Sequence, residues 1–357
     1  MGRRRRVDLF SFFELLKGGL WEHPVDLPEE DIDWTSILAL SEEQTVVGLV
    51  AAGIEHLRGQ KPPRSIANEF IRLIYPFEEQ NERMTAQVAK QAGILREGGV
   101  IAVLLKGQSY ARFYQRPQWR QCGDIDWLVQ PGNKERALAL LRNLPSDSFK
   151  VDLQDEFHTR MSRRWDAFFA RQQASMFSER LFRLWQIGST SVLLPSLRYD
   201  VVYVFAHLFN HFYKGGIGLR QLCDWCRLLY VNADEIDCKM LAEDLYAIGL
   251  MKEWQAFGCF AVKYLGMPVK SMPFYDETLG KKADRIARFI IRVGNFGYNR
   301  QMDYLKYPFF IRKSFSMLRR VSDFVQHISI FPKDSVRFLA HFLGEAIPGT
   351  IRKYREG

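Results

Sequence analysis

The sequence predicts an α+β protein, in which a small mixed β-sheet lies between a helical N-terminal segment and a larger helical C-terminal domain. Three observations predict this class. Helical periodicity covers most of residues 8–98 and returns from residue 196 onward. Between these segments, short apolar runs of strand length are bounded by turn residues. Hydrophobic residues make up 47% of the 357 residues, which is enough for a large buried core.

The N-terminal segment, residues 1–98, is predicted to be helical. Residues 41–57 open with Ser-x-x-Gln, a helix-capping pattern, and we expect one helix there. A single long helix should follow and end at Gly98-Gly99, with any kink near Pro76. No window holds 18 consecutive apolar residues, and no cleavage site follows the N-terminal arginines. We therefore expect a cytoplasmic protein without a transmembrane segment.

Residues 99–195 are predicted to form the α+β core. "VIAVLLKG", at residues 100–107, is an apolar run bounded by glycines, which is typical of a buried strand. A short helix at residues 108–115 and a second strand at residues 124–129 should follow. An amphipathic helix then precedes one or two further strands in residues 149–161, and residues 190–194 add a short edge strand.

Residues 196–280 are predicted to form the larger helical domain, and residues 281–357 a basic helical region. The basic region holds 16 Lys and Arg against 6 Asp and Glu, whereas the whole chain carries a formal charge of +9. This region either contacts a polyanion such as nucleic acid or acidic lipid, or is a solvated basic surface. Cys223 and Cys226 form a CxxC inside a helical pattern, and we interpret them as buried thiols rather than zinc or redox ligands.

Two aspartates on one predicted strand, Asp124 and Asp126, point to a metal site. Side chains two residues apart on a strand share a face, so the two carboxylates would lie together. Neighbouring anions repel unless a cation lies between them, and Mg²⁺ prefers this kind of oxygen ligand. Glu156 on a later strand offers a third carboxylate, with His158 on the same face.

The turn before the short helix offers groups that suit a phosphate. Gly107 permits close approach of the backbone, and a helix N-terminus presents free amides to an anion. Ser109 adds a hydroxyl donor, and Lys106 and Arg120 are candidates for neutralising phosphate charge.

The order of these elements, strand, Gly-x-Ser, helix, D-x-D strand and later carboxylate, is the active-site layout of the nucleotidyltransferase fold typified by DNA polymerase β. The segment "LLKGQSYARFYQRPQWRQCGDIDWLV" closely resembles the conserved pattern of a family of uncharacterised bacterial nucleotidyltransferases. "DEFHTRM" looks like the Glu-Leu-His segment of that family, and "AHLFNHFYKGGIGLRQLCDWCRLL" resembles its His-x-x-x-His and Arg-x-x-x-Asp stretch. The resemblance covers about residues 30–270. The residues that match the main pattern are Lys106, Gly107, Tyr114, Arg120, Gly123, Asp124, Ile125, Asp126, Leu128 and Val129.

The resemblance implies Mg²⁺-dependent transfer of a nucleoside monophosphate from a nucleoside triphosphate to an unidentified acceptor hydroxyl. Asp124 and Asp126 would hold two Mg²⁺ ions, and Glu156 would be the third acidic position. Gly107 and Ser109 would contact the nucleotide phosphates. In most of the wider superfamily these glycine and serine residues are adjacent, whereas here Gln108 separates them.

Several alternatives remain open at this point. His207 and His211 lie four apart on a predicted helix and could bind zinc, line the nucleotide cleft or form structural hydrogen bonds. Arg220 and Asp224 have the spacing of an intrahelical ion pair, or could take a role in acceptor binding. The chain could also be a non-catalytic binding or scaffold protein, for example in surface polysaccharide production, or an RNA-binding protein that uses its basic tail.

Overall fold

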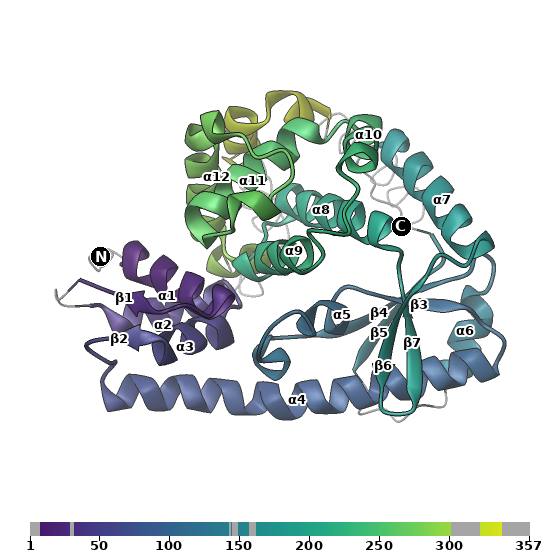
Figure 1. The fold of residues 1–357 in the computed structure, drawn as a ribbon, viewed down its shortest axis with the longest axis horizontal. Helices are drawn as coiled ribbons and strands as arrows, with labels where there is room; N and C mark the ends of the chain where they lie inside the picture. The colour runs from purple at the N-terminus through teal and green to yellow at the C-terminus, as the bar shows by residue number, and fades with distance from the viewer. Residues whose placement is uncertain are drawn as a thin grey trace, which may run out of the picture.

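The computed structural model describes residues 8–28, 32–142, 144, 149–156, 162–300 and 322–337. It has the mixed α+β architecture that the sequence predicts (Figure 1). The long helix α4 runs along one side of the molecule, with helices α1–α3 and strands β1 and β2 near its start and strands β3–β7 near its end. Helices α8, α9, α11 and α12 lie across from α4.

The labelled helices are α1 (Leu9–Trp21), α2 (Trp34–Glu43), α3 (Val47–Glu55), α4 (Arg64–Glu97), α5 (Gln108–Ala111), α6 (Lys134–Leu141), α7 (Arg163–Ser178), α8 (Leu197–Lys214), α9 (Leu219–Val231), α10 (Cys238–Ile248), α11 (Met251–Leu265) and α12 (Gly280–Val293). The strands are β1 (Val25–Asp26), β2 (Leu57–Arg58), β3 (Ala102–Leu105), β4 (Asp124–Val129), β5 (Lys150–Gln154), β6 (Arg183–Ile187) and β7 (Thr190–Leu194). Residues 322–330 and 332–337 are also helical.

The N-terminal segment differs from the prediction in one detail. Residues 41–57 do not form one helix capped by Ser41, because α2 ends at Glu43 and α3 begins at Val47. Thr45 between them has a φ of 56°, which interrupts the helix. The Ser41 hydroxyl instead donates to the carbonyl oxygen of Ile37, one turn back inside α2, at 2.6 Å.

Helix α4 matches its prediction closely. It runs for 34 residues and ends just before Gly98 and Gly99, and Gly99 has a φ of 69°. Pro76 lies inside it. Its second half packs on the sheet, where the Gln91 side chain accepts a hydrogen bond from the indole nitrogen of Trp127 at 2.7 Å. The long helix therefore joins the N-terminal helices to the sheet.

The central sheet has the order β3-β4-β5, with β3 antiparallel and β5 parallel to β4. Its two faces belong to different apolar clusters. Ile125, Trp127 and Val129 pack with α4, α6 and β7 in a smaller cluster. Leu128, whose side chain points to the opposite face, belongs to the main cluster, which spans α1 to α12. The separate β6–β7 hairpin confirms the predicted strand at residues 190–194.

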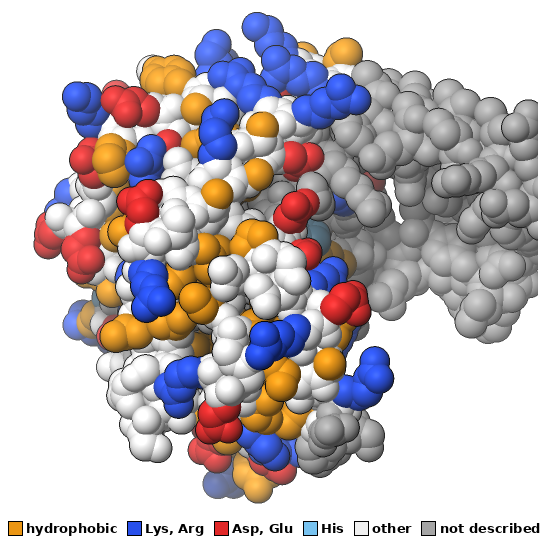
Figure 2. All heavy atoms as spheres, turned by 90° about the vertical axis from the view of Figure 1, so that its right-hand side faces the viewer, with side chains coloured by type: hydrophobic (Ala, Val, Ile, Leu, Met, Phe, Trp, Pro, Cys, Tyr) orange, Lys and Arg blue, Asp and Glu red, His pale blue; other side chains and the backbone are white. Residues whose placement is uncertain are grey.

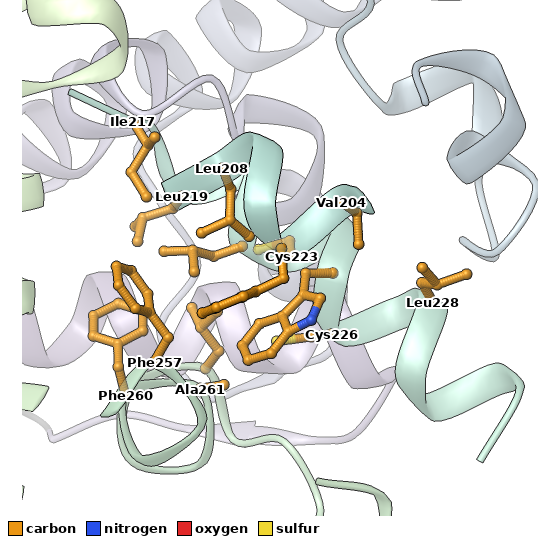
Figure 3. Packing of buried hydrophobic residues seen from close by; sticks show 14 of the residues in the cluster. Val204, Leu208, Ile217, Leu219, Cys223, Cys226, Leu228, Phe257, Phe260 and Ala261 are labelled. Atoms are coloured by element: carbon orange, nitrogen blue, oxygen red, sulfur yellow. The ribbon is translucent and has the colours of Figure 1, made fainter. Parts of the chain in front are cut away.

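Figure 3 shows part of the apolar core between α8, α9 and α11. Cys223 and Cys226 of α9 are fully buried and unpaired among apolar side chains such as Leu208 and Phe257. Burial raises the pKa of both thiols, so they stay protonated and inert. The interpretation of the CxxC as buried thiols is confirmed.

Two buried carboxylates tie the segment after β3 to this helical core. Asp200 on α8 accepts a hydrogen bond from the Tyr110 hydroxyl at 2.5 Å and forms an ion pair with Arg183. Asp224 on α9 accepts one from the Tyr114 hydroxyl at 2.8 Å. The tyrosines of the sequence pattern therefore fix α5 and the residues after it against α8 and α9.

The described surface and the basic C-terminal region add little to the assignment of a function. On the face seen in Figure 2, acidic and basic side chains of the described residues are interspersed. Within the described ranges, no helix has the length and apolar character needed to cross a membrane. Helix α12 confirms the start of the predicted basic helical region, whereas Arg319 and Arg320 lie outside the described residues. The predicted polyanion contact and the predicted domain boundaries at residues 98, 195 and 280 stay predictions.

Candidate active site

The two aspartates of β4 lie on the sheet face that α8 covers. Asp124 begins the strand and is half-buried, whereas Asp126 is only 2% exposed. Both share the face of Leu128, which belongs to the cluster containing α8. Asp126 also raises the pKa of the buried Tyr203 hydroxyl on α8, although burial is the larger cause. The prediction that the two side chains share one strand face is confirmed.

Asp126 is an anion in an unfavourable place. Burial raises its pKa to about 6, and the Asp124 carboxylate adds to this, while Lys106 opposes it. The Lys106 Nζ lies 2.9 Å from Oδ1 of Asp126. Oδ2 is buried and has no hydrogen-bond partner among the described residues. A buried carboxylate oxygen left unpaired in this way favours a ligand that supplies positive charge.

A third carboxylate lies beside this pair, at a residue that the sequence reasoning missed. Asp152 of β5 is the register partner of Asp126, so the two side chains point to the same face. Its charge also raises the pKa of Asp126. Glu156, the predicted third acid, is exposed and lies in a bend two residues after β5 ends. His158 lies outside the described residues.

A signal for Asp152 was present in the strand pattern. Val151 and Leu153 are apolar and alternate with Asp152, which places the carboxylate on the opposite face. What the sequence did not contain was the register that puts Asp152 beside Asp126. The Asp152 side chain also accepts a hydrogen bond from the Gln154 amide at 2.8 Å.

The turn after β3 has the conformation expected of a close backbone approach. Lys106 has a φ of 35°, rare for a residue with a side chain, and Gly107 has a φ of 57°. A Cβ at Gly107 would lie 3.4 Å from the carbonyl oxygen of Asp124. The Ser109 side chain is buried, and its hydroxyl donates to the carbonyl oxygen of Lys106 at 2.9 Å. Ser109 therefore holds the turn that carries Lys106.

The Arg120 guanidinium is already bound by other residues of the protein, so it is not available to bind a phosphate. Its Nε and Nη2 donate to the two oxygens of Asp224 at 2.7 and 2.6 Å, and both side chains are buried. Its Nη1 donates to the Cys122 sulfur at 2.8 Å. The expected ion pair between Arg220 and Asp224 is therefore corrected, because Asp224 pairs with Arg120 from the loop before β4.

This loop is held from the side of α4 as well. The Asn81 amide donates to the carbonyl oxygens of Gln118 and Arg120, at 2.7 and 2.9 Å. The Gln80 amide donates to the carbonyl oxygen of Cys122 at 2.9 Å. Contacts from α4 on one side and α9 on the other fix the loop that leads into Asp124.

His207 and His211 form a contact pair on α8 near the carboxylates, with 3.1 Å between their Nε2 atoms. Burial lowers the pKa of both, and so does the charge of Lys106. The pKa of His211 falls to about 4, even though Asp124 opposes the shift. Both imidazoles are therefore neutral near pH 7, and can donate or accept a hydrogen bond at the site.

The carboxylate face fits a hard divalent cation better than a zinc site. Within the described ranges, no three His, Cys, Asp or Glu side chains are grouped so that they could hold a metal ion together. Mg²⁺ needs only one or two carboxylates and completes its shell with water and phosphate oxygens. Asp124 and the unpaired Oδ2 of Asp126 are groups of that kind.

One of three comparisons with known proteins identifies the family of the chain. Residues 30–266 match the model of a family described as uncharacterised nucleotidyltransferase. The match covers more than half of the chain and includes the sheet, α8 and α9, so this protein belongs to that family. Comparison with curated proteins and with solved structures gives no match. Membership assigns the chain to a class whose general activity is nucleotidyl transfer, with a nucleoside triphosphate as substrate.

Proposed function

We propose that this protein transfers a nucleoside monophosphate from a nucleoside triphosphate to an acceptor hydroxyl. The reaction would take place at the face of β4 that carries Asp124 and Asp126. One observation carries the proposal: Asp126 is buried, is balanced by a single lysine, and leaves Oδ2 without a hydrogen bond among the described residues. Folded proteins keep such a group where a ligand completes it.

Asp124 and Asp126 would hold Mg²⁺, which neutralises the triphosphate and polarises the α-phosphorus when bound. The acceptor oxygen attacks the α-phosphorus, the bond to the bridging oxygen breaks, and pyrophosphate leaves. The proton of the acceptor hydroxyl passes to a carboxylate of the same face. Lys106, which now neutralises Asp126, and the backbone at Gly107 are the candidates for binding phosphate oxygens.

The histidines of α8 have a supporting part in this proposal. His207 and His211 are uncharged near neutral pH, since burial and Lys106 lower the pKa of both. They can therefore form hydrogen bonds to a sugar or acceptor hydroxyl without repelling a metal ion. Arg120 is assigned to the structure of the loop, because Asp224 satisfies its guanidinium.

Two residues compete for the third acidic position. The family resemblance favours Glu156, whereas the strand register favours Asp152, which lies beside Asp126. We propose Asp152 for this role. Asp152→Asn should then lower the transfer rate at least about 100-fold, and Glu156→Gln should lower it by less than about 3-fold.

The test is incubation of the purified full chain with each labelled nucleoside triphosphate, Mg²⁺ and a cell extract as the source of acceptor. Wild type should label an acceptor and release pyrophosphate, and Asp124→Asn/Asp126→Asn should not. Glu135→Gln, an exposed carboxylate on α6, is the matched control and should label normally. Equal labelling by wild type and the double variant would overturn the proposal.

The same assay separates the non-catalytic alternative. A scaffold protein with this fold would bind Mg²⁺ and nucleotide, or neither, without pyrophosphate release in any extract. It would also tolerate the double carboxylate substitution in its binding to a partner.

A further inference from the structure

Arg220, in the first turn of α9, carries a guanidinium that the protein leaves largely unsatisfied. Its Nη1 donates to the carbonyl oxygen of Gln121, whereas Nε is buried and has no hydrogen-bond partner among the described residues. It forms no ion pair within the described part of the chain, in contrast to Arg120, Arg183 and Arg198. Arg220 is half-buried, and a cation that is partly removed from water without an ion-pair partner favours an anion from outside.

The guanidinium lies at the edge of the candidate active site. Gln121, its hydrogen-bond partner, is three residues before Asp124 in the loop that leads into β4. Burial and the neighbouring Arg120 lower the pKa of Arg220, while the charges of Asp224 and Asp124 raise it. Both carboxylate oxygens of Asp224 already accept hydrogen bonds from Arg120. Arg220 is therefore a cation near Asp124 whose Nε has no hydrogen-bond partner among the described residues.

The backbone that carries Arg220 is fixed by close packing. The buried Gln44 side chain accepts from the Leu219 amide at 3.2 Å and donates to the carbonyl oxygen of Ile290 at 3.2 Å. Gly216, in the turn between α8 and α9, has a φ of 91°, and a Cβ there would lie 2.4 Å from the Val293 side chain, so this turn packs directly on α12. The arginine is thus held in place before any ligand arrives, which lowers the entropic cost of binding.

We infer that Arg220 is a binding residue for the phosphate groups of the nucleoside triphosphate at the Asp124 end of the carboxylate face. A guanidinium offers two parallel donors to the oxygens of one phosphate, and this geometry suits a triphosphate better than a sugar or a base. The inference rests on the proposed function, because it assigns a substrate group to the same site. It also replaces Arg120, the arginine that the sequence pattern suggested, with one 100 positions further along the chain.

The experiment measures binding of a nucleoside triphosphate, of inorganic tripolyphosphate and of the corresponding nucleoside to the full chain. Ca²⁺ replaces Mg²⁺ in these titrations so that transfer stays slow. Arg220→Gln should weaken triphosphate and tripolyphosphate binding on the order of 10- to 100-fold and leave nucleoside binding unchanged. Arg220→Lys should recover part of the loss, since it keeps the charge but not the fork. Arg96→Gln, an exposed arginine in the last turn of α4, is the control and should bind as wild type does.

Thermal unfolding of the same variants excludes a structural explanation. Because the guanidinium forms no ion pair among the described residues, Arg220→Gln should unfold at or above the wild-type temperature without ligand and should lose the stabilisation by tripolyphosphate. Wild-type affinity for tripolyphosphate in Arg220→Gln would overturn the inference, and so would wild type that binds neither phosphate ligand. If wild type binds both, Arg220→Gln does not, and no acceptor is labelled, the proposed function fails while the assignment of Arg220 stands.

Discussion

Two buried aspartates of this protein, Asp126 and Asp224, are almost equally inaccessible, with 2% and 4% of their surface exposed. Asp224 receives two hydrogen bonds from the Arg120 guanidinium and a third from the Tyr114 hydroxyl. Asp126 has one ion pair with Lys106 and an oxygen with no hydrogen bond among the described residues. The difference indicates that the Asp224 carboxylate stabilises the fold and that the Asp126 carboxylate is available to bind a ligand.

The largest expected effect concerns Asp224. Asp224→Asn would leave the Arg120 guanidinium buried without its counter-charge, and we expect a loss of about 3–5 kcal/mol in the free energy of unfolding. Denaturation in urea measures this loss. Tyr114→Phe is the milder control, since it removes one hydrogen bond and should cost about 1 kcal/mol. A stability change below about 1 kcal/mol in Asp224→Asn would show that the comparison assigns the structural role to the wrong residue.

Replacement of Asp126 should change the free energy of unfolding in the opposite direction. At pH 8 its carboxylate is ionised in a buried place, so Asp126→Asn should raise the free energy of unfolding of the metal-free protein by about 1–3 kcal/mol. The same variant should bind no Mg²⁺-nucleotide complex.

The pH dependence of this gain follows from the pKa. The folded-state pKa is about 6, above the ordinary value of 3.8, so the folded protein holds the proton more tightly between these values. Wild type and the variant should therefore be about equally stable near pH 3.5. Wild type should then become less stable than the variant as pH rises to 6. Urea denaturation of both proteins across this range provides the measurement. Parallel curves would contradict the assignment of a raised pKa to Asp126.

A further effect is expected for His211 of α8, which lies within electrostatic range of Asp124. The pKa of His211 is lowered to about 4, so the unfolded chain takes up a proton near pH 6.5 that the folded protein refuses. Wild type should lose about 2–3 kcal/mol from this group as pH falls from 7 to 4.5, and His211→Gln should lose correspondingly less. Measuring both unfolding free energies at pH 7 and pH 4.5 tests this. An equal loss in both proteins would remove His211 from the account.

The sequence predicted those parts of the fold and site that depend on local pattern. The period of two along a strand put Asp124 and Asp126 on one face, and glycines marked the end of α4. The Ser41 cap failed because a serine hydroxyl can equally bond to the carbonyl one turn back. Asp152 required the register between two strands, which sequence periodicity does not contain.

The arginines show the same limit more clearly. Spacing of four on one helix predicted an ion pair of Arg220 with Asp224, whereas Arg120, 104 positions earlier, takes that carboxylate. A charged pair within a helix stabilises by a few tenths of a kcal/mol, and a buried bidentate pair outweighs it. Tertiary packing decides which arginine is structural and which is left with free donors.

The most direct test of the central claim is a crystal structure of the full chain with Mn²⁺ in place of Mg²⁺ and a non-hydrolysable nucleoside triphosphate. We expect anomalous density from Mn²⁺ against the carboxylates of Asp124 and Asp126, with Lys106 moved from Asp126 toward a phosphate. Mn²⁺ and nucleotide bound elsewhere, with the Lys106–Asp126 ion pair intact, would contradict it.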